Sequence, residues 1–464
     1  MNAPIIWIVS PVIVSIFPLF LKNTRIRIYL FIGISLLFAA LTLFFEIDQV
    51  GETGLFTFGI SSVQNVLGRN LSLLENDKFL IFLMFVFNAI WGIVSILIKK
   101  TARFIPIGLM YTAFLLAAVS VEPFLYSALI IEIAVILSIP LLVSSQTDSK
   151  NGISRYLIYQ TLAVPFILLA GWFLAGGEIS PVESTQLIQA TVLLGLGFVF
   201  WLAIYPFHSW VPMVFDETDP INSGYIFLLL QLVFFILILQ YIDGFAWLRT
   251  YTVFFQALRF LGIIMAGFGS LGLFFEKSIR KLIGYEFLRS TGILLISIGL
   301  SSAKGITLFS YLIGSRMISF SLLCWSVSHF ESIEKRMSVL NLSDLTQKKP
   351  IASASFLFSL LSLSGMPLTI GFPPLQTLYQ YLAVDYPIIF LLMILCNILI
   401  TITVFRYMRE ILKKKYVLKE ILNSVKENPL LFLILIAIVV LGFFPRIILM
   451  RFEHLVVGFD FLLK

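Results

Sequence analysis

Residues 195–212 read GLGFVFWLAIYPFHSWVP, and this stretch decides the fold. Pro206, His208 and Pro212 interrupt a run that is otherwise apolar enough to cross a membrane. A second interrupted run, LSGMPLTIGFPP, covers residues 363–374. Membrane helices broken by Pro and Gly at corresponding places in two halves are typical of ion-transport folds built from an internal repeat. The pattern predicts two related halves, each with one broken helix.

The composition is that of a membrane protein. Of the 464 residues, 59% are hydrophobic and 12% are charged, and a soluble domain of this size could not bury so much apolar surface. Soluble-enzyme and nucleic-acid-binding functions are therefore excluded, and we read the net charge of +7 as a sign of membrane topology. The two cysteines, Cys324 and Cys396, lie in apolar runs, which favours neither a disulfide nor a metal site. We expect no cofactor and no metal in this chain.

The apolar runs predict an all-α polytopic membrane protein. A helix that spans the bilayer needs about 20 apolar residues, and the sequence contains about 14 such runs. They cover residues 4–21, 28–45, 78–98, 104–121, 124–144, 156–176, 187–212, 222–242, 251–274, 281–301, 305–328, 353–380, 386–408 and 430–450. No basic segment precedes the first run and no cleavage-site pattern follows it. We therefore expect residues 4–21 to be a retained helix and not a signal peptide.

Basic residues predict how these helices are oriented. Lys and Arg gather in the loops after odd-numbered helices, as at residues 99–100 and 413–415. Loops after even-numbered helices hold Arg69, Lys78, Arg249 and Lys304. Because basic loops stay in the cytoplasm, both termini are expected on the outer side, by default of a bacterial plasma membrane. The basic loop of residues 406–429 could lie on the membrane as an amphipathic helix or be a solvated loop.

Four places in the chain resemble one family. Glu132 lies mid-helix within residues 120–142, PFHSWVP at 206–212 is similar to the family pattern P-[FL]-H-x-W-x-P, and IRKLIGY covers 279–285. LSLSGMPLTIGF at 361–372 is similar to the family's LSLAGIPMTLGF. In this order they resemble an antiporter-like membrane subunit of respiratory complex I (NADH:quinone oxidoreductase), or of the related cation/proton antiporter complexes and membrane-bound hydrogenases. The amino-acid sequences of these motifs are most similar to those of the N-type subunit.

The resemblance implies an architecture and a mechanism of proton translocation. Helices 4–8 and 9–13 would be inverted five-helix repeats in which helices 7 and 12 are broken. The chain would divide into residues 1–100 with helices 1–3, residues 101–243 and 244–410 with the repeats, and residues 411–464 with the basic loop and helix 14. A central row of Lys, Glu and His side chains with water would carry protons, driven by redox chemistry in other subunits. The partners would be other membrane-arm subunits, redox subunits of the same complex and the lipid bilayer.

Three positions depart from the family pattern. The family's proton path depends on three intramembrane lysines, and the matching positions here hold Trp201, Leu230 and Leu375. Gln231 and Gln376 stand next to the last two. Trp and Leu cannot take up or release a proton, and an amide can order water without storing a proton. We therefore expect a chain that has kept the fold and is deficient in proton translocation.

Five polar residues remain as candidates for a proton path: Glu132, His208, Glu286, Arg289 and Arg316. A charge at mid-membrane costs about 2.5–3.5 kcal/mol on insertion scales. Each of these residues is therefore expected to have an interaction or a function that offsets this cost. Glu132 could take part in coupling or be a neutral, hydrogen-bonded acid, and His208 could shuttle protons or bond backbone groups freed by the prolines. Glu286 and Arg289, at i and i+3, could form a structural ion pair or a replacement relay.

Arg316 and one further arginine, Arg259, could join these acids. Arg316 and Arg259 lie in apolar helices, and either could pair with Glu132 or with Glu286. If all of them clustered, they would form a new polar path in place of the missing lysines.

Two functions from different classes remain. The first is a structural or coupling subunit of a complex I-type redox-driven proton pump, which contributes no active-site residue to the redox reaction. The second is an active proton or Na⁺ translocating subunit that uses Glu132 and a rearranged polar path. That subunit could belong to complex I, a membrane-bound hydrogenase or a cation/proton antiporter complex. An independent solute carrier fits the motifs poorly.

Overall fold

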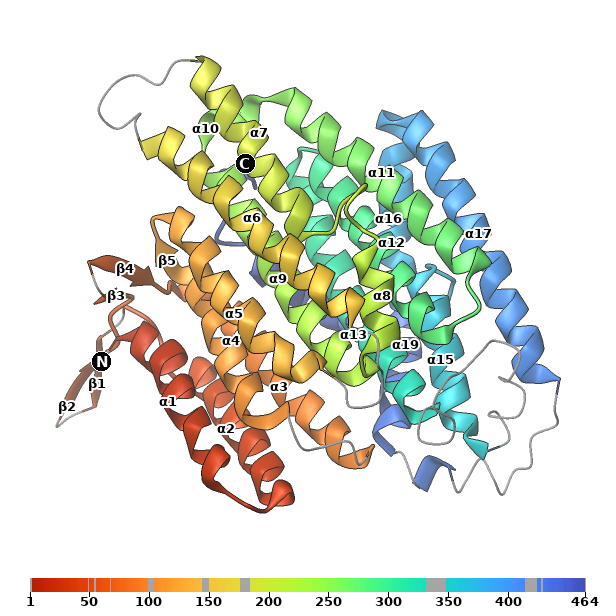
Figure 1. The fold of residues 1–464 in the computed structure, drawn as a ribbon, viewed down its shortest axis with the longest axis horizontal. Coiled ribbons are helices and arrows are strands. Elements are labelled where there is room, and N and C mark those ends of the chain that lie inside the picture. The colour runs from red at the N-terminus through yellow and green to blue at the C-terminus, as the bar shows by residue number, and fades with distance from the viewer. Residues whose placement is uncertain are drawn as a thin grey trace. The chain divides into compact units, whose positions relative to one another are not determined.

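Long apolar helices make up most of the computed structural model (Figure 1). It describes residues 2–48, 50–53, 56–66, 68–98, 104–143, 150–175, 184–330, 348–413, 424–426 and 429–463. Within these ranges nine helices are long and apolar enough to cross a membrane, and five shorter apolar helices accompany them. The chain forms two units, one of residues 1–143, 153–202 and 226–245, the other of residues 144–152, 203–225 and 246–464. The expected all-α polytopic membrane fold is confirmed.

The first unit is a set of packed helices held by apolar contacts and a few buried hydrogen bonds. Its helices are η1 (Ile5–Val9), α1 (Ser10–Ile16), η2 (Phe17–Phe20), α2 (Thr24–Phe44), η3 (Glu75–Asp77), α3 (Lys78–Leu97), α4 (Phe104–Ser120), η4 (Phe124–Tyr126), α5 (Ser127–Leu142), α6 (Asn151–Ala175), α7 (Ser184–Trp201) and most of α9 (Pro220–Gly244). α2 packs on α3 and α4 packs on α5. Asn88 of α3 donates to the hydroxyl of Thr112 on α4 at 2.9 Å, which joins two helices by a buried polar contact.

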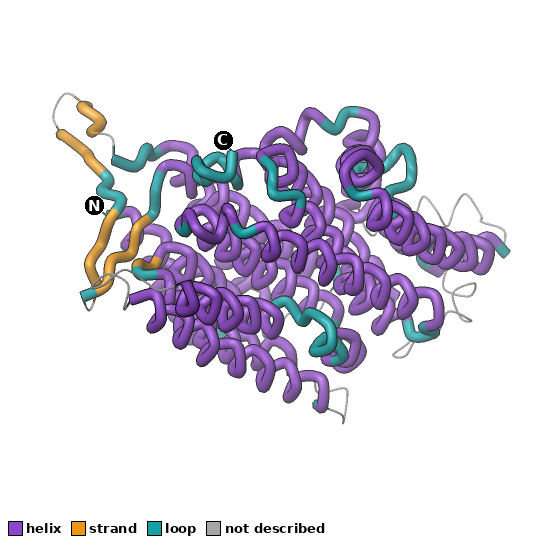
Figure 2. The backbone as a smooth tube through the Cα atoms, turned by 90° about the horizontal axis from the view of Figure 1, so that it is seen from above, coloured by secondary structure: helices purple, strands orange, loops and turns teal. Residues whose placement is uncertain are grey.

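Short strands, which were not expected from the sequence, lie beside the N-terminus in the first unit (Figure 2). β1 (Val50–Thr53) and β2 (Phe56–Gly59) form an antiparallel pair. β3 (Val63–Val66), β4 (Arg69–Ser72) and β5 (Val121–Glu122) form a three-stranded antiparallel sheet in that order. This segment is too polar and too rich in Gly, Thr and Asn for a spanning helix, so its backbone groups pair between strands.

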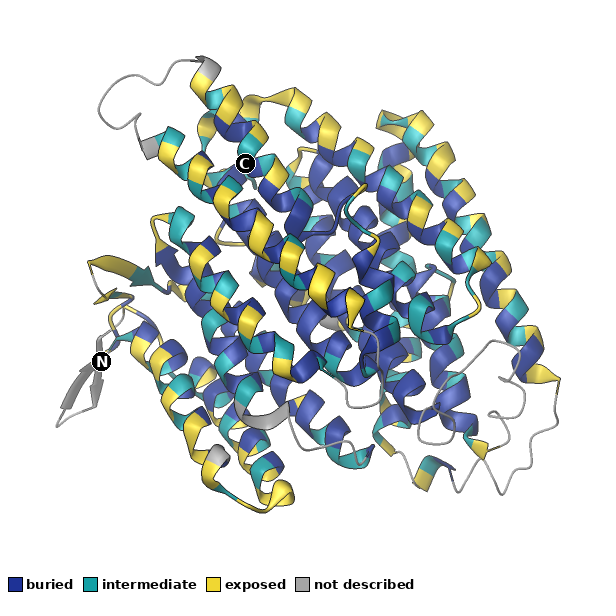
Figure 3. Cartoon of the chain, viewed as in Figure 1, coloured by how far each residue is buried: buried dark blue, intermediate teal, exposed yellow. Residues whose placement is uncertain are grey.

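The second unit is centred on two long, buried helices. It contains α8 (Trp210–Glu217), α10 (Ala246–Thr250), α11 (Thr252–Phe275), α12 (Ile279–Gly299), α13 (Ala303–Phe330), α15 (Pro350–Leu363), α16 (Phe372–Asp385), α17 (Pro387–Leu412), α19 (Pro429–Phe443), α20 (Arg446–Phe452) and η7 (Glu453–Leu455). The apolar windows of α12 and α13 are 94% and 83% buried, whereas that of α17 is 28% buried (Figure 3). Polar side chains on α12 and α13 therefore lie inside the protein and not against lipid.

The two expected helix breaks are present. α7 ends at Trp201 and α8 begins at Trp210, and the intervening chain contains a cis peptide bond before Pro206. α15 ends at Leu363 and α16 begins at Phe372. At the second break Gly365 has a φ of 70°, a conformation that glycine adopts without strain. Proline lacks a backbone N–H, so each Pro-rich segment ends the helical hydrogen bonding and leaves carbonyl groups that need other partners.

Other boundaries differ in detail from the expected ones. The helix expected at 156–176 begins at Asn151, and the last expected helix ends at Phe443, where Pro445 separates it from α20. The basic loop of residues 406–429 is helical as far as Leu412, and residues 414–423 of it lie outside the described residues. The inverted symmetry of helices 4–8 and 9–13 and the exact number of spans stay predictions.

Glycines allow α11 and α12 to approach closely. A Cβ atom on Gly262 would lie 2.7 Å from the backbone oxygen of Gly292, and one on Gly292 would lie 2.6 Å from the backbone nitrogen of Ala266. Backbone atoms cannot rotate away from such a contact as a side chain can. Small residues at a helix–helix interface let the backbones approach, which is how membrane helices gain packing energy.

We predict that Gly292→Ala destabilises the protein by about 1–3 kcal/mol, because the added methyl group overpacks a backbone contact. The matched control is Gly267→Ala on α11, where a Cβ would meet nothing within 4 Å. This control should be neutral or slightly stabilising. Thermal unfolding of the detergent-solubilised protein, followed by tryptophan fluorescence, measures both changes. Equal melting temperatures for the two variants would contradict the close approach.

Candidate functional site

A buried ion pair lies on α12. Glu286 and Arg289 are one helical turn apart, and both side chains face the interior with exposures of 0% and 2%. Arg289 Nε donates to Glu286 Oε2 at 2.9 Å and Arg289 Nη2 donates to Oε1 at 2.7 Å. Two parallel N–H···O bonds between a guanidinium and a carboxylate are the strongest geometry that such a pair adopts. The structure therefore forms the ion pair that the i, i+3 spacing predicts.

Arg289 also closes the end of a broken helix. Its Nη2 donates a short hydrogen bond to the carbonyl oxygen of Leu363, the last residue of α15. The last carbonyls of a helix have no partner within the helix, and the helix dipole makes this end negative. A buried guanidinium satisfies one of these groups and complements the dipole. α12 is thus tied to the break between α15 and α16 by a charged side chain.

Arg316 on α13 adds a second buried cation. Its Nη2 donates to the carbonyl oxygen of Phe287 at 3.2 Å and to the hydroxyl of Thr291 at 3.3 Å, and its guanidinium lies 4.6 Å from the centre of the Phe287 ring. Its Nε has no hydrogen-bond partner. Among the described residues Arg316 forms no ion pair with Glu132 or Glu286, because its hydrogen bonds go to a backbone carbonyl and a hydroxyl group on α12.

Arg259 also forms no ion pair with either acid among the described residues. Arg259 Nη1 donates a short hydrogen bond to the carbonyl oxygen of Gly299, at the end of α12. Its guanidinium lies 4.1 Å from the centre of the Tyr386 ring. Among the described residues the ion pair of Glu286 is with Arg289. We name Glu286, Arg289, Arg316 and the Leu363 carbonyl the Arg289 cluster.

Serines surround the Arg289 cluster. A cavity of about 30 Å³ is lined by Arg316, Ser290, Ser319, Ser362 and Leu375, among others. Ser319 and Ser362 hydrogen-bond to each other at 2.7 Å. A cavity of this size holds about one water molecule. These serines were not among the residues expected from the sequence, although their helical spacing on α13 and α15, as at Ser315 and Ser319 or Ser359 and Ser362, marks one face of each helix.

Glu132 lies in the first unit, on α5. Its Oε1 accepts a hydrogen bond of 2.6 Å from Thr161 on α6, and its Oε2 is buried without a hydrogen-bond partner. On the same pair of helices, Ser138 and Tyr156 hydrogen-bond at 3.0 Å. Among the described residues no basic side chain forms an ion pair with Glu132. The carboxyl group is held by a hydroxyl where the family resemblance implied a lysine.

His208 lies in the first helix break and contacts aromatic rings. Its imidazole is 5.6 Å from the Tyr205 ring and 5.2 Å from the Phe268 ring, measured between centroids. Its Nδ1 is buried without a hydrogen-bond partner. The ring packs against these two aromatic side chains, and the structure brings it to none of the other candidate residues.

The three positions at which the family pattern predicts lysines hold buried apolar side chains. Trp201 is 2% exposed and stacks on Phe234 with ring centroids 4.7 Å apart and planes at 4°. Leu230 and Leu375 are 1% and 3% exposed. Gln376, a candidate for a replacement path, is exposed on the surface of α16 and does not enter the interior with Leu375. None of these three interior positions offers a group that stores a proton.

The described part of the chain contains no group of three or more His, Cys, Asp or Glu side chains that could hold a metal ion. The chemistry of the site is that of buried charge, hydroxyl groups and backbone carbonyls.

A family with the description NADH:quinone oxidoreductase/Mrp antiporter, transmembrane, matches residues 129–401, which is more than half of the chain. The chain belongs to this family. The match begins just before Glu132 and includes both helix breaks and the whole Arg289 cluster. The resemblance indicated by the four motifs is confirmed.

Curated relatives of this antiporter family include the N-type subunit. NADH-quinone oxidoreductase subunit N 2 of Acidobacterium capsulatum is 25% identical over 243 residues, which cover 50% of this chain and 49% of the relative. The subunit N 2 of Syntrophobacter fumaroxidans is 25% identical over 275 residues, 56% of each chain. NADH-ubiquinone oxidoreductase chain 2 of Oryctolagus cuniculus is 24% identical over 300 residues, 64% of this chain and 81% of the relative. The chain thus spans about half the length of the first two relatives it matches.

Solved structures in the antiporter family have the same fold. A chain of the Mrp complex from Dietzia sp. DQ12-45-1b has a TM-score of 0.82 at 13% identity, with 100% of this chain and 99% of that chain covered. A chain of respiratory complex I from Thermus thermophilus has a TM-score of 0.77 at 17% identity, with 99% and 100% covered. At these identities the likeness concerns the fold, and it extends over the full chain.

We predict that Glu286→Gln destabilises the protein by about 3–5 kcal/mol, because it leaves Arg289 buried without its carboxylate. The double variant Glu286→Gln/Arg289→Leu should lose less than the sum of the two single variants, since both partners are then removed. Lys413→Met provides a control: Lys413 forms an i, i+3 pair with Glu410 at 2.6 Å but is 54% exposed. Its loss should cost at most about 1 kcal/mol.

Unfolding of the wild type, the two single variants and the double variant in detergent gives the coupling energy between Glu286 and Arg289. Additive effects of the two single substitutions would show that the pair does not act as a unit.

Proposed function

We propose that this chain is an antiporter-like membrane-arm subunit of a complex I-type, redox-driven proton pump, and that it does not itself translocate protons. Its roles are to extend the membrane arm and to transmit conformational strain between its neighbours. The observation that carries the proposal is the packing of Trp201, Leu230 and Leu375, three buried apolar side chains at positions where the family motifs place lysines. A proton relay needs groups that change charge, and these side chains have none.

The family supports the assembly part of the proposal. Relatives that match at 24–25% identity are subunits of NADH-quinone and NADH-ubiquinone oxidoreductases, and structures with the same fold come from complex I and from an Mrp complex. The partners of this chain are accordingly other membrane-arm subunits, the redox subunits of the same complex and lipid. The bacterial plasma membrane, with both termini on the outer side, is the proposed location.

The Arg289 cluster suits a structural role. Arg289 is held in place by Glu286 and holds the carbonyl end of α15, so a movement of α12 would be passed directly to the second helix break. The ion pair and the bond to the Leu363 carbonyl form a fixed cross-link between α12 and α15. Such a cross-link transmits force between the two helices.

The surroundings of Glu132 favour an alternative function, which is active ion translocation. Glu132 Oε2 is buried and has no hydrogen-bond partner, so a proton or a water molecule could occupy that position. In that alternative the subunit actively translocates H⁺ or Na⁺ through Glu132 and a rearranged path of hydroxyl groups and water. The alternative requires that Glu132 be essential for ion movement.

We predict that Glu132→Gln leaves the number of protons translocated per electron unchanged in the assembled complex. The complex is reconstituted in vesicles, and proton uptake is followed with a pH-sensitive dye while electron transfer is measured in parallel. Thr161→Val is the matched control, because it removes the hydroxyl that binds Glu132 Oε1 and retains the acid. A lower proton yield for Glu132→Gln alone would establish the alternative.

Assembly of each variant is measured by a pull-down in mild detergent with mass spectrometry of the co-purifying proteins. Recovery of other antiporter-like subunits together with iron–sulfur or flavin subunits is the expected result. Recovery of this chain by itself, also for the wild type, would contradict the proposed assembly.

A further inference from the structure

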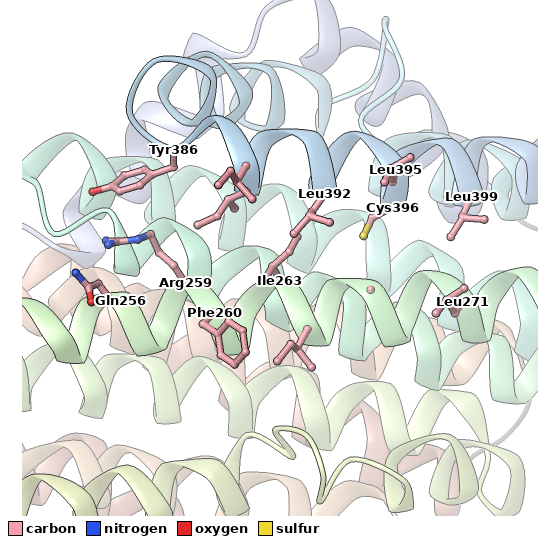
Figure 4. Close-up of a pocket in the computed structure, with 14 residues that line it drawn as sticks. Gln256, Arg259, Phe260, Ile263, Leu271, Tyr386, Leu392, Leu395, Cys396 and Leu399 are labelled. Atoms are coloured by element: carbon pink, nitrogen blue, oxygen red, sulfur yellow. The ribbon is translucent and has the colours of Figure 1, made fainter.

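An apolar groove runs between α11 and α17 in the second unit. It has a volume of about 620 Å³, within the range of about 300–1,000 Å³ that is usual for ligand sites. Its walls are side chains such as Phe260, Ile263, Leu271, Leu392 and Leu399. Figure 4 shows these side chains along the seam between the two helices. Nothing in the Arg289 cluster or in the proposed function uses this groove.

The polar groups of the groove gather at one end. Gln256, Arg259 and Tyr386 lie together at that end, and Leu271 and Leu399 lie at the other (Figure 4). The Arg259 guanidinium carbon lies 4.1 Å from the centre of the Tyr386 ring. Of its nitrogen atoms only Nη1 donates a hydrogen bond to the Gly299 carbonyl oxygen. A guanidinium has five N–H donors, so several remain for a ligand at the mouth of the groove. Among the described residues no carboxylate forms an ion pair with Arg259.

The polar end also lies at the level of two helix ends. Gly299 is the last residue of α12, and Tyr386 immediately precedes α17. In membrane proteins, Tyr and Arg side chains near helix ends mark the boundary between hydrocarbon and headgroups. From there the apolar part of the groove follows Ile388–Leu399, a rise of about 17 Å at about 1.5 Å per residue. One leaflet contributes about half of a hydrocarbon core of about 30 Å, so the apolar part suits one acyl chain.

We infer that the groove between α11 and α17 binds an anionic phospholipid, with an acyl chain against the apolar walls and the phosphate at Arg259. The combination of one cation at the headgroup level with a purely apolar remainder matches the amphipathic shape of such a lipid. A helix of a neighbouring subunit would instead need a long apolar strip without a charge at one end. The inference is independent of whether the chain translocates ions.

Different substitutions test the apolar part of the groove and the cation at its polar end. Gly267 is part of the groove wall, and a Cβ there meets nothing within 4 Å, so Gly267→Phe fills the groove without a backbone clash. Gly195→Phe on α7 is the matched control, because that glycine is equally unobstructed and lies outside the groove. Arg259→Gln removes the cation, and Arg259→Lys keeps it.

The test is native mass spectrometry of the full-length protein, delipidated in mild detergent and titrated with phosphatidylglycerol or phosphatidylcholine. The wild type is expected to retain one phosphatidylglycerol at least about fivefold more tightly than phosphatidylcholine. Arg259→Gln should abolish this preference and Arg259→Lys should restore most of it. Gly267→Phe should weaken binding of both lipids about tenfold or more, and Gly195→Phe should not. Melting temperatures show that each variant is folded.

Two results would overturn the inference. One is equal binding of both lipids by the wild type. The other is unchanged lipid affinity in Gly267→Phe, which would leave the groove to another occupant, such as a helix of a neighbouring subunit.

Discussion

The second unit depends on one constraint: a helix that is broken inside a membrane must find partners for its terminal backbone groups. Water is scarce in the bilayer core, and an unsatisfied carbonyl or amide there costs several kcal/mol. At the break between α15 and α16 the partner is Arg289, which donates to the Leu363 carbonyl. That arginine needs a counter-charge of its own, and Glu286 provides it one turn away on α12. The close glycine contact between α11 and α12 and the serine-lined cavity lie around this pair.

The same arrangement explains how the fold can persist without the family's lysines. A lysine relay needs mobile charges and water, whereas the Arg289 cluster fixes its charges by bidentate and backbone hydrogen bonds. Trp201 replaces a titratable side chain with an aromatic stack on Phe234. Under the proposed function, the interior of the protein is rigidly packed and does not conduct protons. The broken helices remain because the fold requires them.

Much of the architecture could be predicted from the sequence. The apolar runs located the helices, Pro206 and Pro367 located the breaks, and the i, i+3 spacing identified the pair of Glu286 and Arg289. Sequence could not show where Arg259 and Arg316 point, because both are oriented by carbonyl groups of distant helix segments. It also could not distinguish Leu375 from Gln376, since helix rotation alone decides which of two neighbours faces the interior. The strands of residues 50–72 were missed because such short strands carry no spanning signal, and because β4 pairs with the distant β5.

The proposed loss of proton translocation requires that no continuous path of water pass Trp201, and hydroxyl-radical footprinting by X-ray radiolysis of water measures this property. Radicals formed from bound water modify adjacent side chains, and tryptophan is a sensitive target, so Trp201 reports on its own surroundings. The assembled complex in lipid nanodiscs is exposed for increasing times, and peptides are quantified by mass spectrometry. We expect Trp201 to remain unmodified while exposed loop residues react. Rapid modification of Trp201 would reveal a hydrated path through the chain and contradict the loss of translocation.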